Sequence, residues 1–267
     1  MTSQNIVENG LIFEDFPNVF NQMKIINLFS PNYNRKKRLT NSIKFIVIHY
    51  TGMQSERESV KKLRDPKSKI SSHYLISRNG LVYMLVEERY VAWHAGHSCW
   101  NGHKNLNNNS IGIELVNKGH QLGYKSFKKK QISNLLKLCK KLVKKYNIKA
   151  RNILGHSDIS PTRKIDPGEK FPWKYLAIKG IGIRHDCESN LLRRCRRLKV
   201  RTKQNKNKFL KNLNNIGYCF PNNSKNLYIK TIKAFQRHFR KELINGILDQ
   251  ECFIIAQNLA NKLQKSS

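Results

Sequence analysis

IKFIVIHY, residues 43–50, is a near-continuous apolar run that ends in a histidine and a tyrosine. Such a run is typical of a strand that is buried on both faces of a sheet. His49 is polar and stands close to the end of this run, where side chains from neighbouring strands can converge on one sheet edge. The sequence therefore predicts a central buried strand with a candidate functional side chain at its carboxyl end.

Three further segments are predicted to complete the sheet. Residues 71–86 (SSHYLISRNGLVYMLV) contain two β-rich runs around Asn79-Gly80. That pair favours a hairpin, because both residues accept positive φ. SIGIELVN at 110–117 and NILGH at 152–156 are also predicted as strands. We expect all of these strands to form one sheet.

Two helices are expected to cover the sheet. Residues 127–147 place apolar side chains at helical spacing, with lysines elsewhere. Residues 56–64 carry Glu56 and Glu58 in their first turn, and Pro66 follows them. The predicted fold class is α/β, with a mixed central sheet that is flanked by helices.

The composition changes after FPWKYLA at 171–177. Residues 191–208 are rich in arginine and lysine, and three short helical patterns with turn signals between them follow. Three such helices can form a small bundle. We therefore expect four parts, namely an N-terminal extension at 1–42, the α/β domain at 43–185, a basic linker at 186–204 and a helical domain at 205–267.

The chain is strongly basic. It has 51 Lys and Arg against 17 Asp and Glu, a net charge of +34, which favours electrostatic association with anionic polymers. Lys, Asn and Ile are over-used together, however, and all three have A/T-rich codons, so base composition explains much of the excess. Because nucleic-acid footprints usually cluster on one face or motif, and the lysine excess runs throughout the chain, no specific nucleic-acid partner is expected.

Six cysteines lack the short regular spacing of a disulfide or zinc-knuckle framework. Reduced thiols are therefore expected, which favours a reducing compartment. The N-terminal residues show no secretory signal and no lipid-accepting cysteine, and no stretch suits a membrane span. A cytoplasmic location is expected, with the periplasm or cell surface, reached by a non-standard route, as the alternative.

GHSDISPTRKIDPG, residues 155–168, contains two candidate partners for His49, namely His156 and Asp166. A lone buried histidine is more often a satisfied core residue. Two imidazoles and one carboxylate, however, are a standard ligand set for a catalytic zinc, because they leave a fourth position free for water. We therefore expect one zinc ion per chain on these three residues.

Two charged residues are candidates for the chemistry beside such an ion. Glu114 stands in SIGIELVN, where apolar neighbours would raise its pKa and make it a general base for a zinc-bound water. The alternative is an edge-strand glutamate that points to solvent. Lys164 precedes Asp166 by two residues and could stabilise an oxyanion, although a solvated lysine is an equal alternative in so basic a chain.

AWHAGHSCWNGH at 92–103 is rich in imidazole, indole, glycine and asparagine. This composition suits a loop that lines a sugar-binding cleft better than a metal cage. Trp93 and His94 are therefore expected to contact substrate and not to coordinate the metal.

In chain order the sequence carries IVIHYTG, SSHYLISRNG, AWHAG, SIGIELVN and GHSDISPTRKIDPG, followed by FPW. These segments, within about residues 45–175, resemble the zinc-dependent N-acetylmuramoyl-L-alanine amidases of the family 2 type, the AmpD and AmiD group. In the tail, AFQRHFR and GILD resemble the three-helix peptidoglycan-binding domain of AmiD-like members. The resemblance implies that residues 43–185 are the catalytic domain and that residues 205–267 bind peptidoglycan.

The resemblance also implies the roles of single residues. It places zinc on His49, His156 and Asp166, and it makes Glu114 and Lys164 catalytic. It further implies that Arg78 of SRNG contacts a carboxylate of the stem peptide. One departure is Asn105, which stands at about the place where AmpD enzymes carry a second arginine, and this puts the peptide specificity in question.

The implied reaction is hydrolysis of the amide bond between N-acetylmuramic acid, including its 1,6-anhydro form, and L-alanine. The substrates would be peptidoglycan or anhydro-muropeptides, in turnover or recycling of the bacterial cell wall. The alternative is a non-catalytic peptidoglycan recognition protein of the same fold. The presence of all three candidate ligands together with Glu114 and Lys164 argues for the enzyme.

Overall fold

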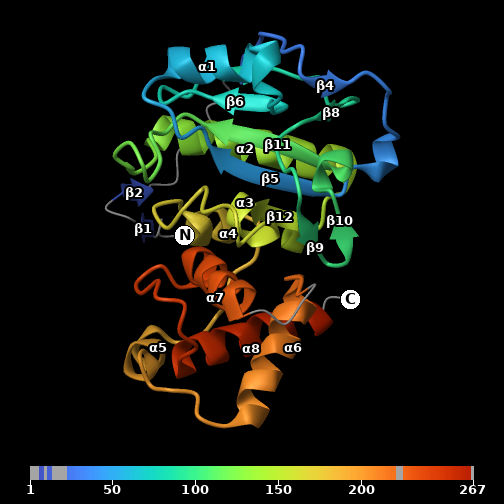
Figure 1. The fold of residues 1–267 in the computed structure, drawn as a ribbon. Helices are drawn as coiled ribbons and strands as arrows, with labels where there is room; N and C mark the ends of the chain where they lie inside the picture. The colour runs from blue at the N-terminus through green and yellow to red at the C-terminus, as the bar shows by residue number, and fades with distance from the viewer. Residues whose placement is uncertain (1–5, 9–10, 14–22, 221–224, 266–267) are drawn as a thin grey trace.

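A six-stranded sheet forms the centre of the molecule (Figure 1). The computed structural model describes residues 6–8, 11–13, 23–220 and 225–265. In spatial order the strands are β12 (Ile153–Gly155), β5 (Phe45–Tyr50), β11 (Ser110–Leu115), β6 (Tyr74–Ile76), β7 (Val82–Met84) and β3 (Ile25–Asn27).

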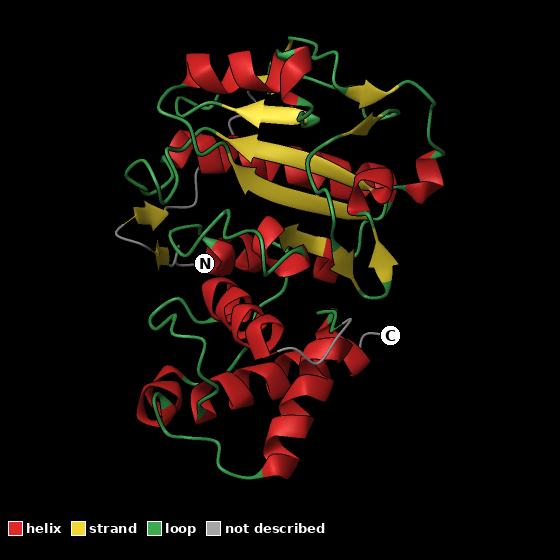
Figure 2. Ribbon diagram, viewed as in Figure 1, coloured by secondary structure: helices red, strands yellow, loops and turns green. Residues whose placement is uncertain are grey.

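The first four strands of this order run parallel (Figure 2). Strand β7 runs antiparallel to β6. This confirms the predicted mixed sheet. The predicted hairpin is also confirmed, since Ile76 pairs with Val82 across a turn in which Gly80 has φ 89°. Because β5, β11 and β12 are parallel, their carboxyl ends lie at one edge of the sheet.

Both predicted helices are present. α1 (Glu56–Arg64) begins at Ser55, whose side chain accepts the backbone N–H of Glu58, a standard N-cap. α2 (Lys129–Tyr146) packs its apolar stripe on one face of the sheet, against Ile46, Ile48, Ile111 and Ile113. No helix in the described ranges combines the length and the apolar character that crossing a bilayer requires.

The other face of the sheet is covered by the C-terminal helices. Phe45, Val47 and Leu154 belong to the same apolar cluster as Phe209 and Phe235. These helices lie beneath the β12 edge in Figure 1 and are α5 (Ser189–Cys195), α6 (Lys203–Ile216), α7 (Lys225–Phe239) and α8 (Gln250–Lys265). The helical region and the sheet therefore share one core.

Short elements connect these layers. α3 (His156–Ile159) follows β12 directly, and α4 (Trp173–Ile178) precedes the C-terminal helices. Three two-stranded ribbons are β1 (Ile6–Glu8) with β2 (Leu11–Phe13), β4 (Tyr33–Asn34) with β8 (Val91–Ala92), and β9 (Cys99–Trp100) with β10 (His103–Lys104). Short 3-10 helices span Thr40–Ser42, Pro66–Ser68, Leu106–Asn109 and Ala150–Asn152.

Strand β3 lies within the expected N-terminal extension and yet forms an edge of the central sheet. Part of that extension lies outside the described residues. The expected basic linker contains α5. The limits of the four expected parts stay a prediction.

The expectation of reduced thiols is wrong for one pair of cysteines. Cys99 and Cys219 form a disulfide across 120 residues of sequence, while Cys139, Cys187, Cys195 and Cys252 are free. The pair was missed because its two members are far apart in sequence and meet only where β9 contacts the residues that follow α6. Because of this bridge, the cysteines no longer favour a reducing compartment, and the location stays a prediction.

Candidate functional site

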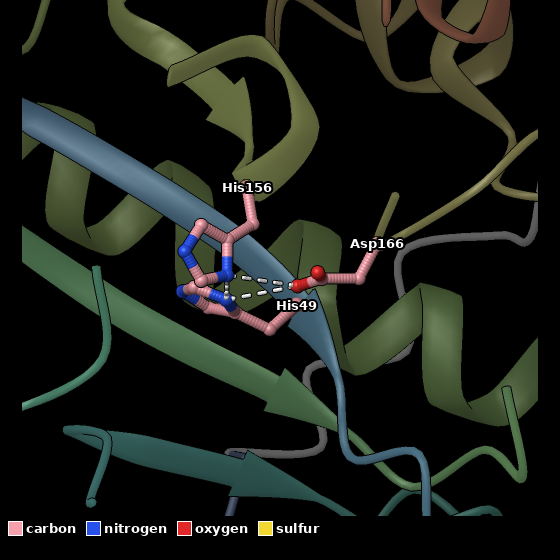
Figure 3. A group of neighbouring side chains, drawn as sticks. All are labelled: His49, His156 and Asp166. Atoms are coloured by element: carbon pink, nitrogen blue, oxygen red, sulfur yellow. Dashed lines mark hydrogen bonds and ion pairs between the residues drawn. The ribbon is translucent and has the colours of Figure 1, made fainter. Parts of the chain in front are cut away.

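Three segments bring their polar side chains to the edge where the parallel strands end. His49 is near the end of β5, and His156 opens α3 directly after the adjacent strand β12. Asp166 follows in the loop after α3, and its side chain turns back toward both imidazoles (Figure 3). All three side chains are buried. The topology thus brings His49 together with two residues that lie more than one hundred positions later in the sequence.

The geometry of the three ligand atoms suits one small metal ion. His49 Nδ1 lies 3.0 Å from His156 Nδ1 and 3.0 Å from Asp166 Oδ2, and the third distance, His156 Nδ1 to Asp166 Oδ2, is 3.2 Å. Tetrahedral bonds of the length that zinc forms with nitrogen and oxygen place two ligand atoms roughly 3.3 Å apart. The triangle is therefore close to the size that a shared ion requires.

Hydrogen bonding on the far side of one ring supports the same conclusion. His156 Nε2 lies 3.1 Å from the carbonyl oxygen of Ala95, which can only accept a hydrogen bond. In the neutral imidazole, Nε2 therefore carries the hydrogen and Nδ1 presents a lone pair to the triangle. Lone pairs and a carboxylate that face one another repel unless a cation lies between them. The donor set thus fits a metal site.

The protonation states agree with this interpretation. Burial, and then the neighbouring His156, lower the pKa of His49 to about 4, so its ring is neutral at pH 7. Burial opposes ionisation of Asp166, but the His156 and His49 imidazoles outweigh it and hold the pKa of this carboxyl well below its usual range. Neutral imidazole and ionised carboxylate are the forms that bind a metal.

Glu114 stands beside His49 in the register of β11 and β5, so both side chains leave the sheet on the same face. Burial, followed by the charge of Asp166, raises the pKa of Glu114 to about 8, and Lys164 opposes this rise. Among the described residues, no group hydrogen-bonds the buried Oε2 of Glu114. The carboxyl is thus prepared to exchange a proton with a molecule that enters the site.

Lys164 lies in the loop between α3 and Asp166, where its backbone N–H donates to the Ser160 carbonyl at 3.0 Å. Its charge acts on both His49 and Glu114. The lysine is half-buried and stands within electrostatic reach of the triangle, in agreement with a role at the site.

Two further candidates, Arg78 and Trp93, lie outside the triangle of ligand atoms. Arg78 lines a cavity of about 160 Å³ together with Asn117 and Lys118, which follow β11. Trp93 is half-buried, and its indole N–H donates to Asn34 Oδ1 at 2.8 Å. The roles of Arg78 and Trp93 in substrate binding stay predictions.

His94 lies beside His49, and its expected contact with substrate stays a prediction. Its Nδ1 is 3.1 Å from His49 Nε2, and its Nε2 is 3.1 Å from Ser110 Oγ. Both ring nitrogens thus contact other side chains of the protein. The ring lies behind a candidate ligand, on the side away from the triangle.

The loop of Asp166 is held by residues that were not predicted from the sequence. Tyr50 Oη lies 2.9 Å from His120 Nδ1, and His120 Nε2 lies 3.0 Å from Glu169 Oε2. Tyr124 Oη donates to the Pro167 carbonyl at 2.6 Å. These bonds connect the end of β5 to the loop that carries Asp166. Tyr50 is next to His49 and could have been suspected, whereas nothing in the sequence around His120 or Tyr124 predicts this contact.

Comparison with known proteins connects this geometry to a family. Residues 39–169 match the family model described as N-acetylmuramoyl-L-alanine amidase. The chain is 39% identical over 236 residues to the N-acetylmuramoyl-L-alanine amidase AmiD of Escherichia coli, a match that covers 82% of this chain and 83% of AmiD.

Two solved structures are similar over most of the chain. One is E. coli AmiD in complex with the substrate anhydro-N-acetylmuramic acid-L-Ala-D-γ-Glu-L-Lys, with TM-score 0.72, 35% identity and coverage of 86% of this chain and 92% of AmiD. The other is AmpDh3 of Pseudomonas aeruginosa in complex with anhydromuramic pentapeptide, with TM-score 0.73, 32% identity and coverage of 87% and 96%. Both similarities extend beyond the matched family segment into the C-terminal helices.

Proposed function

The chain belongs to the N-acetylmuramoyl-L-alanine amidase family, and from this premise we propose that it hydrolyses the bond between N-acetylmuramic acid and L-alanine. The 1,6-anhydro form of the sugar is included, since two similar structures hold anhydro-muropeptides. The observation that carries the proposal is the buried cluster of His49, His156 and Asp166, which a metal-dependent amidase needs and a recognition protein does not.

Zinc is the metal that we propose for this cluster. Two imidazole nitrogens and one carboxylate oxygen are a standard catalytic ligand set for zinc, and the spacing of the three atoms suits it. When bound, the ion would supply Lewis acidity toward water and toward the amide carbonyl.

The chain's own residues supply the proton transfer and the charge stabilisation. Glu114, with a pKa close to neutrality and an unpaired carboxyl oxygen among the described groups, takes the proton of the attacking water and passes it to the leaving amine. Lys164 places a positive charge beside the same centre and stabilises the oxyanion of the tetrahedral intermediate.

Substrate contacts are proposed for the rim of the site. Arg78, in the cavity beside Asn117 and Lys118, binds a carboxylate of the stem peptide. Trp93 packs against the sugar. The helices within 205–267 bind peptidoglycan and hold the catalytic site near an insoluble substrate, as the AFQRHFR and GILD segments suggest.

The experiment is incubation of the purified full-length protein with an anhydro-muropeptide and, separately, with intact sacculi. Products are identified by mass. We expect the anhydro-sugar and a peptide with a free L-alanine amino terminus. If the protein binds the muropeptide and leaves it intact, it is a recognition protein; if it cuts between two amino acids, the family's reaction does not apply to this chain.

A further inference from the structure

The two candidate ligand histidines share one structural feature. Each presents Nδ1 to the triangle and turns Nε2 toward the same two-residue segment, His94 and Ala95. His49 Nε2 lies 3.1 Å from His94 Nδ1, and His156 Nε2 lies 3.1 Å from the Ala95 carbonyl oxygen. Because a neutral imidazole carries a single N–H, the partner of Nε2 decides whether Nδ1 is free to bind a metal.

A chain of hydrogen bonds fixes the tautomer of His49. It begins at the Leu106 carbonyl, which accepts the hydroxyl proton of Ser110 at 2.5 Å. Ser110 Oγ is then an acceptor for His94 Nε2–H at 3.1 Å, which leaves Nδ1 of His94 without a proton. That nitrogen accepts the Nε2–H of His49. His49 Nδ1 is consequently a lone pair, as His156 Nδ1 is.

We propose that His94 and Ala95 form a platform that sets the tautomer and the direction of both metal-binding histidines, and that His94 is a positioning residue. This inference rests on the metal site of the proposed function. It departs from the expectation that His94 contacts substrate, because both of its ring nitrogens are engaged by the protein.

The backbone of His94 and Ala95 is held by one side chain that was not predicted from the sequence. Asn107 Oδ1 accepts the backbone N–H of His94 at 3.0 Å and that of Ala95 at 2.7 Å. Asn107 belongs to the 3-10 helix Leu106–Asn109, immediately before β11. A run of three asparagines gives no sign of which one makes this contact.

Two further features fit the same role. Gly112 in β11 leaves the space for the His94 ring, because a Cβ atom there would stand 2.4 Å from His94 Cγ. Arg163 Nη2 donates to the Ala95 carbonyl at 3.1 Å, beside the bond from His156. The backbone of residues 94–95 is thus fixed on both sides.

Zinc affinity tests the platform, and it is independent of turnover. The metal-free full-length protein and its variants are titrated with zinc against a chromophoric chelator. Outer contacts of this kind are worth roughly 10- to 100-fold in metal affinity. We expect Asn107→Ala and His94→Leu to weaken zinc binding within that range.

Matched variants separate positioning from general damage. Asn108→Ala changes an exposed neighbour in the same helix and should bind zinc like the parent. Asn107→Asp keeps an acceptor oxygen and His94→Asn keeps a polar group near the place of Nδ1, so both should recover part of the affinity. Thermal unfolding of the metal-free proteins identifies a variant that has lost its fold. If this happens at one of the two positions, His94 or Asn107, the zinc affinity of the variants at the other position tests the proposal.

If folded His94→Leu and folded Asn107→Ala bind zinc as tightly as the parent protein, the proposed role of the platform is wrong. The proposed function would be unaffected. Equal weakening by the conservative variants would also count against the platform, because the polar contact would then be irrelevant. A parent protein that binds no zinc would instead overturn the metal site itself. The two failures are therefore distinguishable.

Discussion

At the scale of single residues, Glu114 carries the largest expected consequence for the reaction. Once ionised, its carboxylate is a strong proton acceptor, because burial and Asp166 raise its pKa to about 8, while Lys164 opposes this rise. It does not belong to the triangle of ligand atoms, so its removal should leave the metal in place.

We predict that Glu114→Gln retains zinc and loses most of its turnover. Loss of a general base costs roughly 10²- to 10⁴-fold, and the loss should fall on kcat. The measurement is steady-state kinetics on an anhydro-muropeptide, with metal content determined on the same sample. A variant with nearly parental kcat would remove Glu114 from the mechanism.

A stability measurement checks the unusual pKa of Glu114 without any turnover. The folded-state pKa of about 8 lies above the ordinary value of 4.5, so ionising this carboxyl destabilises the metal-free protein increasingly as the pH rises between those values. We expect metal-free Glu114→Gln to gain stability relative to the parent from pH 5 to pH 8. If the difference in the free energy of unfolding between variant and parent is constant across that range, the pKa of Glu114 is not raised.

At the scale of elements, one carboxylate fastens helix α2 to the sheet. Glu88, in the loop after β7, accepts the hydroxyl protons of Tyr74 in β6 and Tyr146 in α2, and it accepts from Lys145 Nζ at 2.5 Å. Burial opposes ionisation, but the bonds from Lys145, Tyr146 and Tyr74 outweigh it and lower the pKa of Glu88.

We predict that Glu88→Gln destabilises the protein by about 1–3 kcal/mol at pH 7. Since the folded-state pKa lies below the unfolded value, this stabilisation is present above the ordinary pKa of 4.5 and is lost as the pH falls through the folded-state value. Urea unfolding at a series of pH values measures it. Glu87→Gln is the control, because Glu87 forms a solvent-exposed pair with Arg89. If the destabilisation caused by Glu88→Gln does not decrease at acidic pH, the charge of Glu88 does not contribute to the stability of the protein.

The elements themselves could be predicted from the sequence because local patterns determine them. The apolar run of β5, the Asn79-Gly80 turn and the helical spacing of α2 each lie within a window of about twenty residues or fewer. Strand β3 was missed because three residues give no periodicity, and its pairing with β7 depends on the rest of the sheet.

The residues of the site also differ in how far the sequence alone predicts them. His49, His156 and Asp166 were found because ligand chemistry restricts which residue types can serve. The position of His94 beside His49 could not be predicted, since it depends on the space left by Gly112 and on a hydrogen bond to Ser110. Those two residues are strand residues in the sequence and become part of the site only when β11 lies beside β5.

At the scale of the whole molecule, the C-terminal helices contact the segment that carries His156. Asp158, two residues after this histidine, accepts from Tyr218 Oη at 2.7 Å and lies 2.8 Å from His238 Nδ1. The Cys99–Cys219 disulfide joins strand β9 to the residues that follow α6. No local pattern predicts these contacts, because each joins residues that are sixty or more positions apart.

We predict that a chain ending at residue 204 loses its stability and its activity on soluble muropeptides together. The truncation exposes Phe45, Val47 and Leu154 and leaves the buried Asp158 without its partners from the C-terminal helices. The separate helical domain that is expected from the composition change and from the AFQRHFR and GILD segments implies the opposite, namely a tail whose removal spares small substrates. Thermal unfolding and muropeptide hydrolysis by both proteins decide between them, and full activity of the truncated protein would show that the tail is an independent unit.

The most direct test of the metal centre is the position and amount of zinc in the protein. Anomalous scattering at the zinc edge, from crystals of the full-length parent, should show one ion per chain bonded to His49 Nδ1, His156 Nδ1 and Asp166 Oδ2. Crystals of His156→Ala prepared in the same way should show little or none. Full occupancy in that variant, or an ion bonded instead to His94 or to His73, whose ring lies 5.7 Å from that of His94, would contradict the proposed metal site.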